Sequence, residues 1–123
     1  MVQRWCLGGV LISGALLLNG CGNPVPPAPT PQEALALRPA DPRIASLYES
    51  ACKACHAVAG TGAPLVHDHA AWDPRWKQGL PVLLDHVLQG YRGMPAGGQC
   101  LTCTPQDHQA LIRFLADQPE PKP

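Results

Sequence analysis

The pentapeptide Cys52-Lys53-Ala54-Cys55-His56 limits the possible folds of this chain more than any other feature. On a helical turn its two thiols lie on one side, and the histidine follows them directly. Cys-x-x-Cys-His is the attachment sequence of haem c, in which the thiols form thioethers with two vinyl groups and the histidine ligates the iron. We therefore predict a helical segment that carries one covalently bound haem. Zinc ribbons and redox dithiols share the Cys-x-x-Cys spacing, so both stay open as alternatives at this point.

Met94 is the second residue with the chemistry of an iron ligand. It is the only methionine besides Met1, and it lies in a loop rich in glycine and proline at residues 93–98. A methionine that only fills a core usually belongs to an apolar helical stripe, and no such stripe surrounds this one. A thioether at the second axial position raises the reduction potential of a haem. We predict that Met94 is the sixth ligand of the iron.

Residues 1–20 have the composition of an export signal rather than of a folded segment. Arg4 supplies a positive charge, and the apolar stretch at 7–18 is too short to span a bilayer as a stable helix. The tetrapeptide at 18–21, Leu-Asn-Gly-Cys, resembles a bacterial lipobox, in which the cysteine is acylated. We expect a signal peptide followed by a lipid-modified Cys21, and ordinary signal cleavage nearby is the alternative. Export places the mature chain in an oxidising compartment, where disulfides persist.

Prolines separate this leader from the rest of the chain. Seven of them fall between Asn23 and Pro42, and such a composition favours an extended polyproline II conformation that builds no core. We predict that residues 21–42 are the lipid-anchor cysteine and a tether, residues 43–118 the folded domain, and residues 119–123 a tail. A domain of this size has a marginal core, to which a buried haem would add apolar volume.

Helix signals follow the tether, and no segment has the alternating pattern of a strand. Three helices are indicated by capping residues, by proline in the first turn and by apolar residues at helical spacing. The first begins at Asp41 and runs into the pentapeptide, the second begins near Pro81, and the third begins at Thr104 with a capping box. A shorter helical turn is expected after Pro74, and His108 is expected on the polar face of the third helix. The predicted fold class is all-α, with three to four helices wrapped around one haem.

Several ordered segments around the pentapeptide resemble the small class I cytochromes c and, within them, cytochrome c5. The resemblance covers residues 44–115, almost the whole predicted domain. The matching segments are Cys52-x-x-Cys55-His56-Ala57, Gly62-Ala63-Pro64, Ala70-Ala71-Trp72-x-x-Arg75, Gly90-Tyr91-x-Gly93-Met94-Pro95 and Cys100-x-x-Cys103. Together these segments are much more specific than the haem motif alone. The leader and the proline-rich stretch are additions to the bare domain of that family.

The resemblance implies a small cytochrome c fold with one haem c, in which the first helix crosses the last. Cys52 and Cys55 would carry the haem. His56 and Met94 would ligate the iron. The Pro64 carbonyl would accept a hydrogen bond from the other ring nitrogen of His56 and so fix the orientation of the ring.

Further residues receive expected positions from the same resemblance. Leu65 would line the haem pocket. Trp72 and Arg75 would lie toward the haem propionates. Cys100 and Cys103 would form the short disulfide that is typical of cytochrome c5.

The resemblance also implies that the chain carries single electrons between redox partner proteins. From the export signal and the lipobox-like tetrapeptide we expect it at the periplasmic side of a membrane, held there by a lipid anchor. A dehydrogenase, another cytochrome or an oxidase would be such a partner. The formal net charge is zero, which gives no basic surface for nucleic acid, and no convincing acid–base pair indicates an enzyme. Two functional alternatives remain: a haem subunit of a larger oxidoreductase, and a ligand-binding or sensory haem protein. A zinc site shared by Cys52, Cys55, Cys100 and Cys103 is the structural alternative.

Overall fold

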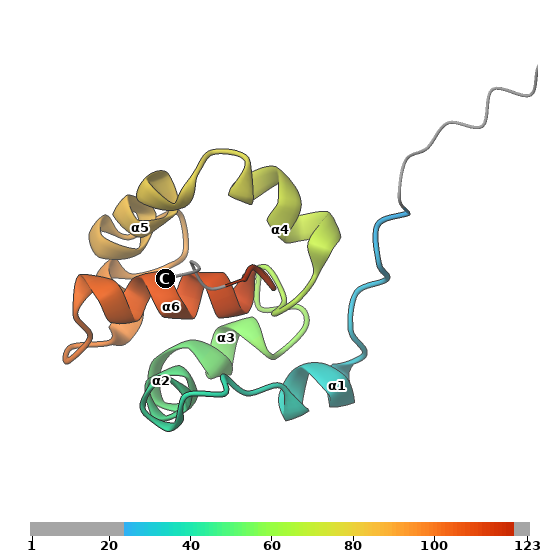
Figure 1. The fold of residues 1–123 in the computed structure, drawn as a ribbon, viewed down its shortest axis with the longest axis horizontal. Coiled ribbons are helices and arrows are strands. Elements are labelled where there is room, and N and C mark those ends of the chain that lie inside the picture. Colours follow the sequence, from blue (N-terminus) through green and yellow to red (C-terminus); the bar gives the residue numbers. More distant parts are fainter. Residues whose placement is uncertain (1–23, 120–123) are drawn as a thin grey trace, which may run out of the picture.

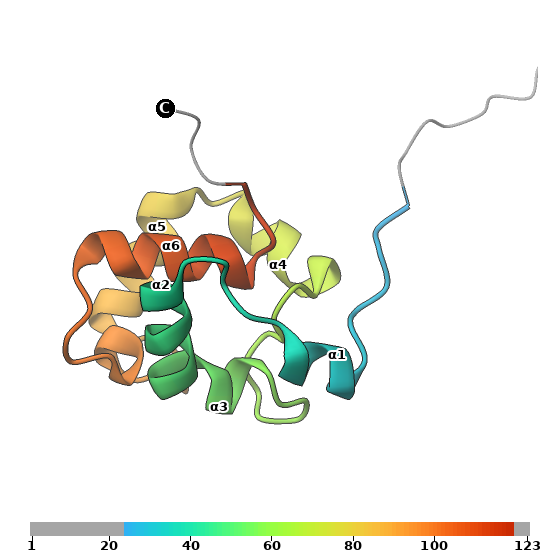
Figure 2. The same ribbon diagram turned by 60° about the horizontal axis from the view of Figure 1, so that its bottom comes forward.

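The computed structural model describes residues 24–119, and this part of the chain is built of helices (Figures 1 and 2). In chain order the elements are α1 (Pro31–Ala36), α2 (Pro42–Leu47), the π-helix η1 (Tyr48–Cys52), α3 (Lys53–His56), α4 (His69–Trp76), α5 (Leu80–Gln89), the 3₁₀-helix η2 (Ala96–Gln99) and α6 (Pro105–Leu115). Residues 24–119 contain no strand, only an isolated bridge between Tyr91 and Met94. The predicted all-α class is confirmed. The predicted signal peptide and Cys21 lie outside the described residues.

The first helix of the predicted domain begins at the expected residue and leads directly into the pentapeptide. The Asp41 carboxylate accepts hydrogen bonds from the backbone N–H groups of Arg43 and Ile44, and Pro42 stands in the first turn. After α2 the helix widens to the single π turn η1, and α3 continues it. The π turn ends at Cys52, and such turns are frequent at functional sites because they displace the side chains that follow.

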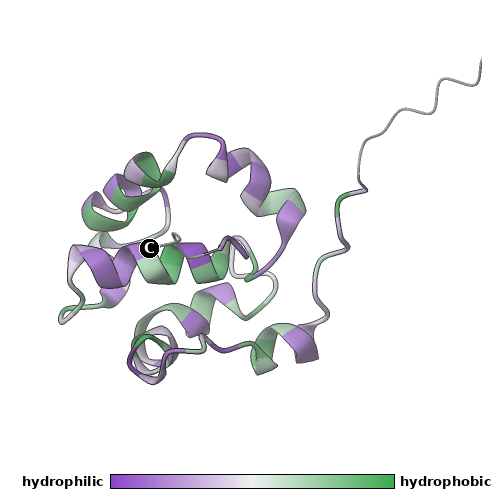
Figure 3. Cartoon of the chain, in the orientation of Figure 1, coloured by the Kyte–Doolittle hydropathy of each residue, from purple (hydrophilic) through white to green (hydrophobic). Residues whose placement is uncertain are grey.

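The core lies between α6 and the segment formed by α2, η1 and α3. In Figure 1, α6 runs between α4 and α5 on one side and α2 and α3 on the other, and it contacts α5 and α2 directly. A capping box on Thr104 starts α6, as predicted. Polar and apolar residues alternate around α6 (Figure 3), and its buried face includes Leu111 and Leu115. Tyr48 of η1 is fully buried there, and its ring meets that of Phe114 edge-on with 4.9 Å between centroids.

The fourth helix begins earlier than the sequence indicates. A helical turn was expected to follow Pro74, but α4 starts at His69 and holds Pro74 in its interior. Asp68 is the N-cap, and its side chain accepts a hydrogen bond from the backbone N–H of Ala71. The proline sits in the sixth helical position, where its ring removes one intrahelical donor. Trp72 is only 6% exposed, and its burial in the core stabilises the helical turn that precedes Pro74.

The expected tether is shorter than its proline content suggests. Residues 21–42 were predicted to be extended, whereas residues 31–36 within them form α1. Thr30 and Glu33 build a capping box, and the helix-favouring residues after Pro31 continue it. Ala34 is fully buried and belongs to the same core cluster as Tyr48. The folded unit therefore begins near residue 30 rather than at residue 43.

Candidate cofactor site

The pentapeptide lies where η1 passes into α3, at the edge of the core. Cys52 is partly buried and Cys55 is exposed, and both are free thiols among the four cysteines of residues 24–119. Burial, and then the nearby Cys55, raises the pKa of Cys52 to about 11. The helical turn places two free thiols next to one another, without a disulfide between them. Thioether formation with a haem requires this state of the pair.

His56 is held in one orientation by the backbone. Its ring is buried, and Nδ1 donates a hydrogen bond to the Pro64 carbonyl over 2.8 Å, because a carbonyl can only accept. This is the contact predicted for Pro64, and it is confirmed. The tautomer leaves the lone pair on Nε2, which has no hydrogen-bond partner in the described part of the chain. Burial lowers the pKa of His56 most, and the charge of Arg75 lowers it further, so the ring is neutral and able to ligate a metal.

The loop after the pentapeptide is tied back to it by three hydrogen bonds. The backbone N–H of Val66 donates to the His56 carbonyl over 2.7 Å. The Thr61 hydroxyl donates to the Cys55 carbonyl, also over 2.7 Å. Together with the bond from His56 to Pro64, these contacts close residues 57–66 into a compact loop against α3. These hydrogen bonds therefore hold the imidazole of His56 in place beside the two cysteines.

Trp72 supports this loop from the side of α4. Its indole N–H donates to the Leu65 carbonyl over 2.7 Å, and its ring lies 5.9 Å from that of His56, centroid to centroid. Leu65 is partly buried against the core. The guanidinium of Arg75 donates to the Ala71 carbonyl within α4. Both polar groups thus have protein partners, and the contact of Trp72 and Arg75 with haem propionates stays a prediction.

Met94 stands in a tight turn that its sequence neighbours enforce. Tyr91 and Met94 exchange both backbone hydrogen bonds, over 3.0 Å and 2.9 Å. The turn needs glycine at position 90, because φ there is 85° and a Cβ would lie 3.0 Å from the backbone nitrogen of Ala96. Met94 is partly buried, and η2, which follows it, contacts η1. The loop that carries Met94 and the segment that ends at Cys52 are therefore neighbours in space.

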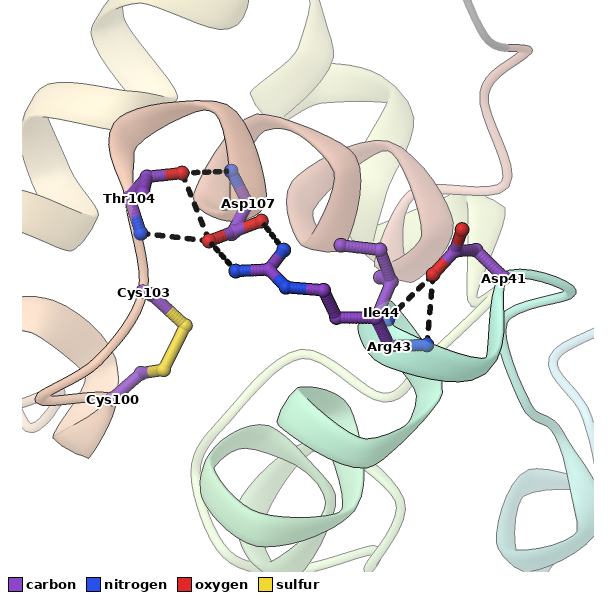
Figure 4. A network of polar contacts seen from close by, with 7 residues as sticks. All are labelled: Asp41, Arg43, Ile44, Cys100, Cys103, Thr104 and Asp107. Carbon is purple, nitrogen blue, oxygen red and sulfur yellow. Dashed lines mark hydrogen bonds and ion pairs between the residues drawn. A yellow bond between two sulfur atoms is a disulfide. The ribbon is translucent and has the colours of Figure 1, made fainter.

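A disulfide joins Cys100 and Cys103, with 5.4 Å between their Cα atoms, at the start of α6 (Figure 4). The Sγ atoms and a ring nitrogen of His108 lie within 4.8 Å of one another, and this group of metal-ligating residues among residues 24–119 includes neither Cys52 nor Cys55. The four cysteines do not meet at one site, and the disulfide occupies both sulfurs of the second pair. The zinc alternative is therefore not supported.

His108 is a residue whose position the sequence did not reveal. It was expected on the polar face of the last helix, but it is only 5% exposed. Its Nε2 donates to the Gly97 carbonyl over 3.1 Å, while Nδ1 is buried without a partner in the described chain. Helical spacing could not find this burial, because the covering contact comes from Gly97 in η2, outside the helix that carries His108.

The donor set fits a covalently held haem. The two free thiols, the oriented neutral imidazole of His56 and the thioether of Met94 belong to residues 52–94, and the elements that carry them pack together. These are the ligand types that c-type haem with low-spin iron requires.

Comparison with known proteins connects the chain to a set of haem proteins. A family model described as "Cytochrome C oxidase, cbb3-type, subunit III" matches residues 39–115. The chain is 44% identical over 75 residues to cytochrome c-555 of Chlorobaculum tepidum, which covers 58% of this chain and 69% of that protein. It is 41% identical over 63 residues to cytochrome c5 of Azotobacter vinelandii, which covers 50% of this chain and 76% of that protein.

A solved structure has the same arrangement of helices. The matching chain comes from the crystal structure of the electron transfer complex of nitrite reductase with cytochrome c. It aligns with a TM-score of 0.56 and 36% sequence identity, over 63% of this chain and 94% of the other. The alignment thus spans nearly the whole of the other chain and somewhat less than two thirds of this one.

Proposed function

The chain belongs to the class I c-type cytochromes, and from this premise we propose that Cys52 and Cys55 carry its haem, with His56 and Met94 as axial ligands. It has the small cytochrome c fold and is a monohaem electron-transfer protein rather than an enzyme. Haem c supplies an iron that takes up and returns a single electron, and the protein binds and orients it. The observation that carries the ligand assignment is the hydrogen bond from His56 to the Pro64 carbonyl, which leaves Nε2 for the iron.

The proposed ligation by Met94 is supported by the turn that holds it. The reciprocal hydrogen bonds with Tyr91 fix the backbone of Met94, and the contact between η2 and η1 keeps its loop beside the haem-bearing segment. A thioether at the sixth position would favour Fe(II) and keep small molecules from the iron. Both effects suit a carrier of electrons better than a ligand sensor.

We further propose that Cys21 is lipid-modified after export and anchors the protein at the periplasmic side of a membrane. The lipobox-like tetrapeptide supports this, and no helix in residues 24–119 is both long and apolar enough to cross a bilayer. With α1 folded, the tether is confined to residues 21–29 and spans at most roughly 30 Å. The proposed haem domain thus runs from α1 to the end of α6.

Redox proteins are the proposed partners, and two observations indicate which kinds. The similar solved cytochrome c forms an electron transfer complex with nitrite reductase, so a terminal reductase or oxidase is one class. The family model carries the name of an oxidase subunit. This favours, as a second candidate, a function inside a larger oxidoreductase.

Absorption spectra of the purified holoprotein test the ligand assignment. We expect a low-spin c-type spectrum, a far-red band from Met–Fe(III) ligation, and no change of the reduced spectrum with carbon monoxide. The double variant Cys52→Ala/Cys55→Ala should lose haem during denaturation, whereas Cys100→Ala/Cys103→Ala, the matched control, should retain it. Haem that stays bound to the first variant after denaturation would overturn the assignment.

Membrane fractionation tests the anchor and the partners. Wild-type protein should sediment with membranes, and the Cys21→Ala variant should be recovered as a soluble exported form. Co-purification of wild-type protein with an oxidoreductase complex after mild detergent extraction would support the second candidate. A wild-type protein found only in the soluble fraction would contradict lipid anchoring.

A further inference from the structure

The side chain of Met94 leans against the backbone of η2. A Cβ on Gly98 would lie 3.0 Å from the methyl carbon of Met94 and 3.9 Å from a methyl group of Val87 on α5. Gly97 and Gly98 both have positive φ, at 67° and 57°. Of the two glycines only Gly98 lies close to the methionine: a Cβ on Gly97 would meet nothing within 4 Å, whereas a larger residue at position 98 would press on the methyl group of Met94.

We call the backbone of Gly97 and Gly98 the glycine shelf, or the shelf. The Gly97 carbonyl holds it in place. It accepts the backbone N–H of Cys100 over 2.9 Å and the Nε2–H of His108 over 3.1 Å. A carbonyl has two lone pairs, so both of its acceptor positions are filled. One donor belongs to a residue of the disulfide and the other to the first turn of α6. The shelf is thereby connected to the helix at the centre of the core.

His108 is an unfavourable residue for a purely structural position. It is 5% exposed, and its use of Nε2 as donor leaves Nδ1 as a buried acceptor without a partner in residues 24–119. An unsatisfied buried nitrogen lowers stability, and a leucine of similar volume would avoid this loss. What leucine cannot supply is the N–H that reaches Gly97.

We propose that His108 is a positioning residue for the sixth iron ligand, acting through the hydrogen bond to Gly97 and the contact of Gly98 with the methyl group of Met94. The inference rests on the proposed ligation by Met94. The shelf limits how far the thioether can withdraw from the iron, and His108 holds the shelf in place from α6. Loss of this hydrogen bond would let η2 and Met94 move together, and the iron–sulfur bond would lengthen or open.

The test compares His108→Leu with His108→Gln in the full-length holoprotein. We expect His108→Leu to lose the far-red Met–Fe(III) band, to bind carbon monoxide when reduced, and to show a lower midpoint potential, because methionine ligation raises the potential. Glutamine keeps an N–H donor near the position of Nε2, so His108→Gln should restore the band and the potential. Circular dichroism and thermal unfolding establish that both variants are folded.

A second pair of variants tests the contact between Gly98 and Met94 directly. Its result does not depend on whether His108→Leu is folded. Gly98→Ala places a methyl group against Met94 and should weaken the band. Gly79→Ala is the matched control: φ there is 90°, so the variant carries a similar backbone strain, its Cβ would meet only Pro81 at 3.6 Å, and the band should be unchanged.

The outcomes separate the two proposals. A wild-type protein without the far-red band would overturn ligation by Met94, and the positioning by His108 with it. A wild-type band that persists unchanged in His108→Leu, with the same potential and no carbon monoxide binding, would overturn the positioning alone and leave Met94 as the ligand.

Discussion

Arg43 in the first turn of α2 holds Asp107 in the first turn of α6 through two parallel hydrogen bonds, one of them 2.9 Å from Nη2 to Oδ2 (Figure 4). The same carboxylate accepts the backbone N–H and the hydroxyl of Thr104. The start of α2, which leads to the proposed haem attachment site, and the capping box of α6 are thus joined at one buried side chain. Bidentate arginine–carboxylate pairs of this kind fix geometry as well as adding stability.

Substitution of Asp107 should destabilise the fold in a pH-dependent manner. Hydrogen bonds from Arg43, and then from the backbone of Thr104, hold the pKa of Asp107 well below its ordinary value. A depressed pKa contributes stability that is present above the unfolded-state pKa and is lost as the pH falls. We expect Asp107→Asn to lower the midpoint of urea unfolding at about pH 7, and the difference from wild type to shrink toward about pH 3. A difference that is constant over this range would contradict the assigned cause.

His69 should show the opposite pH dependence. When protonated, its ring donates from Nδ1 to the Asp73 carboxylate over 3.0 Å and from Nε2 to the Asp117 carboxylate over 3.1 Å, and these contacts raise its pKa. A raised pKa contributes stability that is present below the unfolded-state value and is lost as the pH rises through the folded-state value. His69→Gln should therefore be less stable than wild type at about pH 5.5, with a smaller difference at about pH 8.5. Equal differences at both pH values would show that the ion pairs are not responsible.

The indole N–H of Trp72 should stabilise the loop that orients His56. Trp72→Phe keeps most of the ring but leaves the Leu65 carbonyl without its donor, which should reduce the free energy of unfolding by about 1–3 kcal/mol. Urea unfolding of the holoprotein measures this loss. Trp76→Phe is the matched control on the same helix, because its ring is only partly buried. An equal loss in both variants would assign the effect to ring size instead.

Removal of the disulfide should lower stability without loss of haem. Cys100→Ala/Cys103→Ala opens a short loop, for which chain entropy predicts a loss of about 2 kcal/mol. Because Cys100 also donates its backbone N–H to Gly97, we expect the Met–Fe(III) band to become sensitive to temperature. Denaturant unfolding and spectra recorded on heating test the two parts. A variant as stable as wild type would exclude a structural contribution of the bridge.

The docking of α1 should be sensitive to volume at a single position. Ala34 is fully buried and belongs to the core cluster. Ala34→Val should therefore lower the free energy of unfolding by about 1–3 kcal/mol through overpacking. Ala36→Val lies on the exposed side of the same helix and controls for helix propensity. Comparable unfolding midpoints for the two variants would mean that α1 does not pack on the core in solution.

The sequence predicted those parts of the molecule whose signals are local. Asp41 and Thr104 each stand before a proline at a helix start, and both are N-caps in the structure. The bond from His56 to the Pro64 carbonyl was implied by the family resemblance, and these residues are close in sequence. The two N-caps need only a few neighbouring residues, so local spacing reveals them, whereas the bond to Pro64 was expected only from the resemblance.

Other features depend on contacts between separate elements or on irregular backbone, and the sequence did not reveal them. The capping box at Thr30 was overlooked because seven prolines dominated the composition around it, and only packing of Ala34 on the core makes α1 part of the domain. The burial of His108 depends on η2, which folds over it from outside α6. The π turn before Cys52 likewise has no signature in the helical pattern.

The buried Ala34 also has a consequence for the rate at which electrons leave the protein. With Cys21 as the proposed anchor and α1 docked on the core, few residues separate the bilayer from the haem domain. A partner in the same membrane then meets the haem by a search in two dimensions, at an effective concentration of order millimolar for a short linker. A longer tether would dilute the haem through a larger volume, whereas, with the proposed anchor, the docked helix would keep it close to the membrane surface.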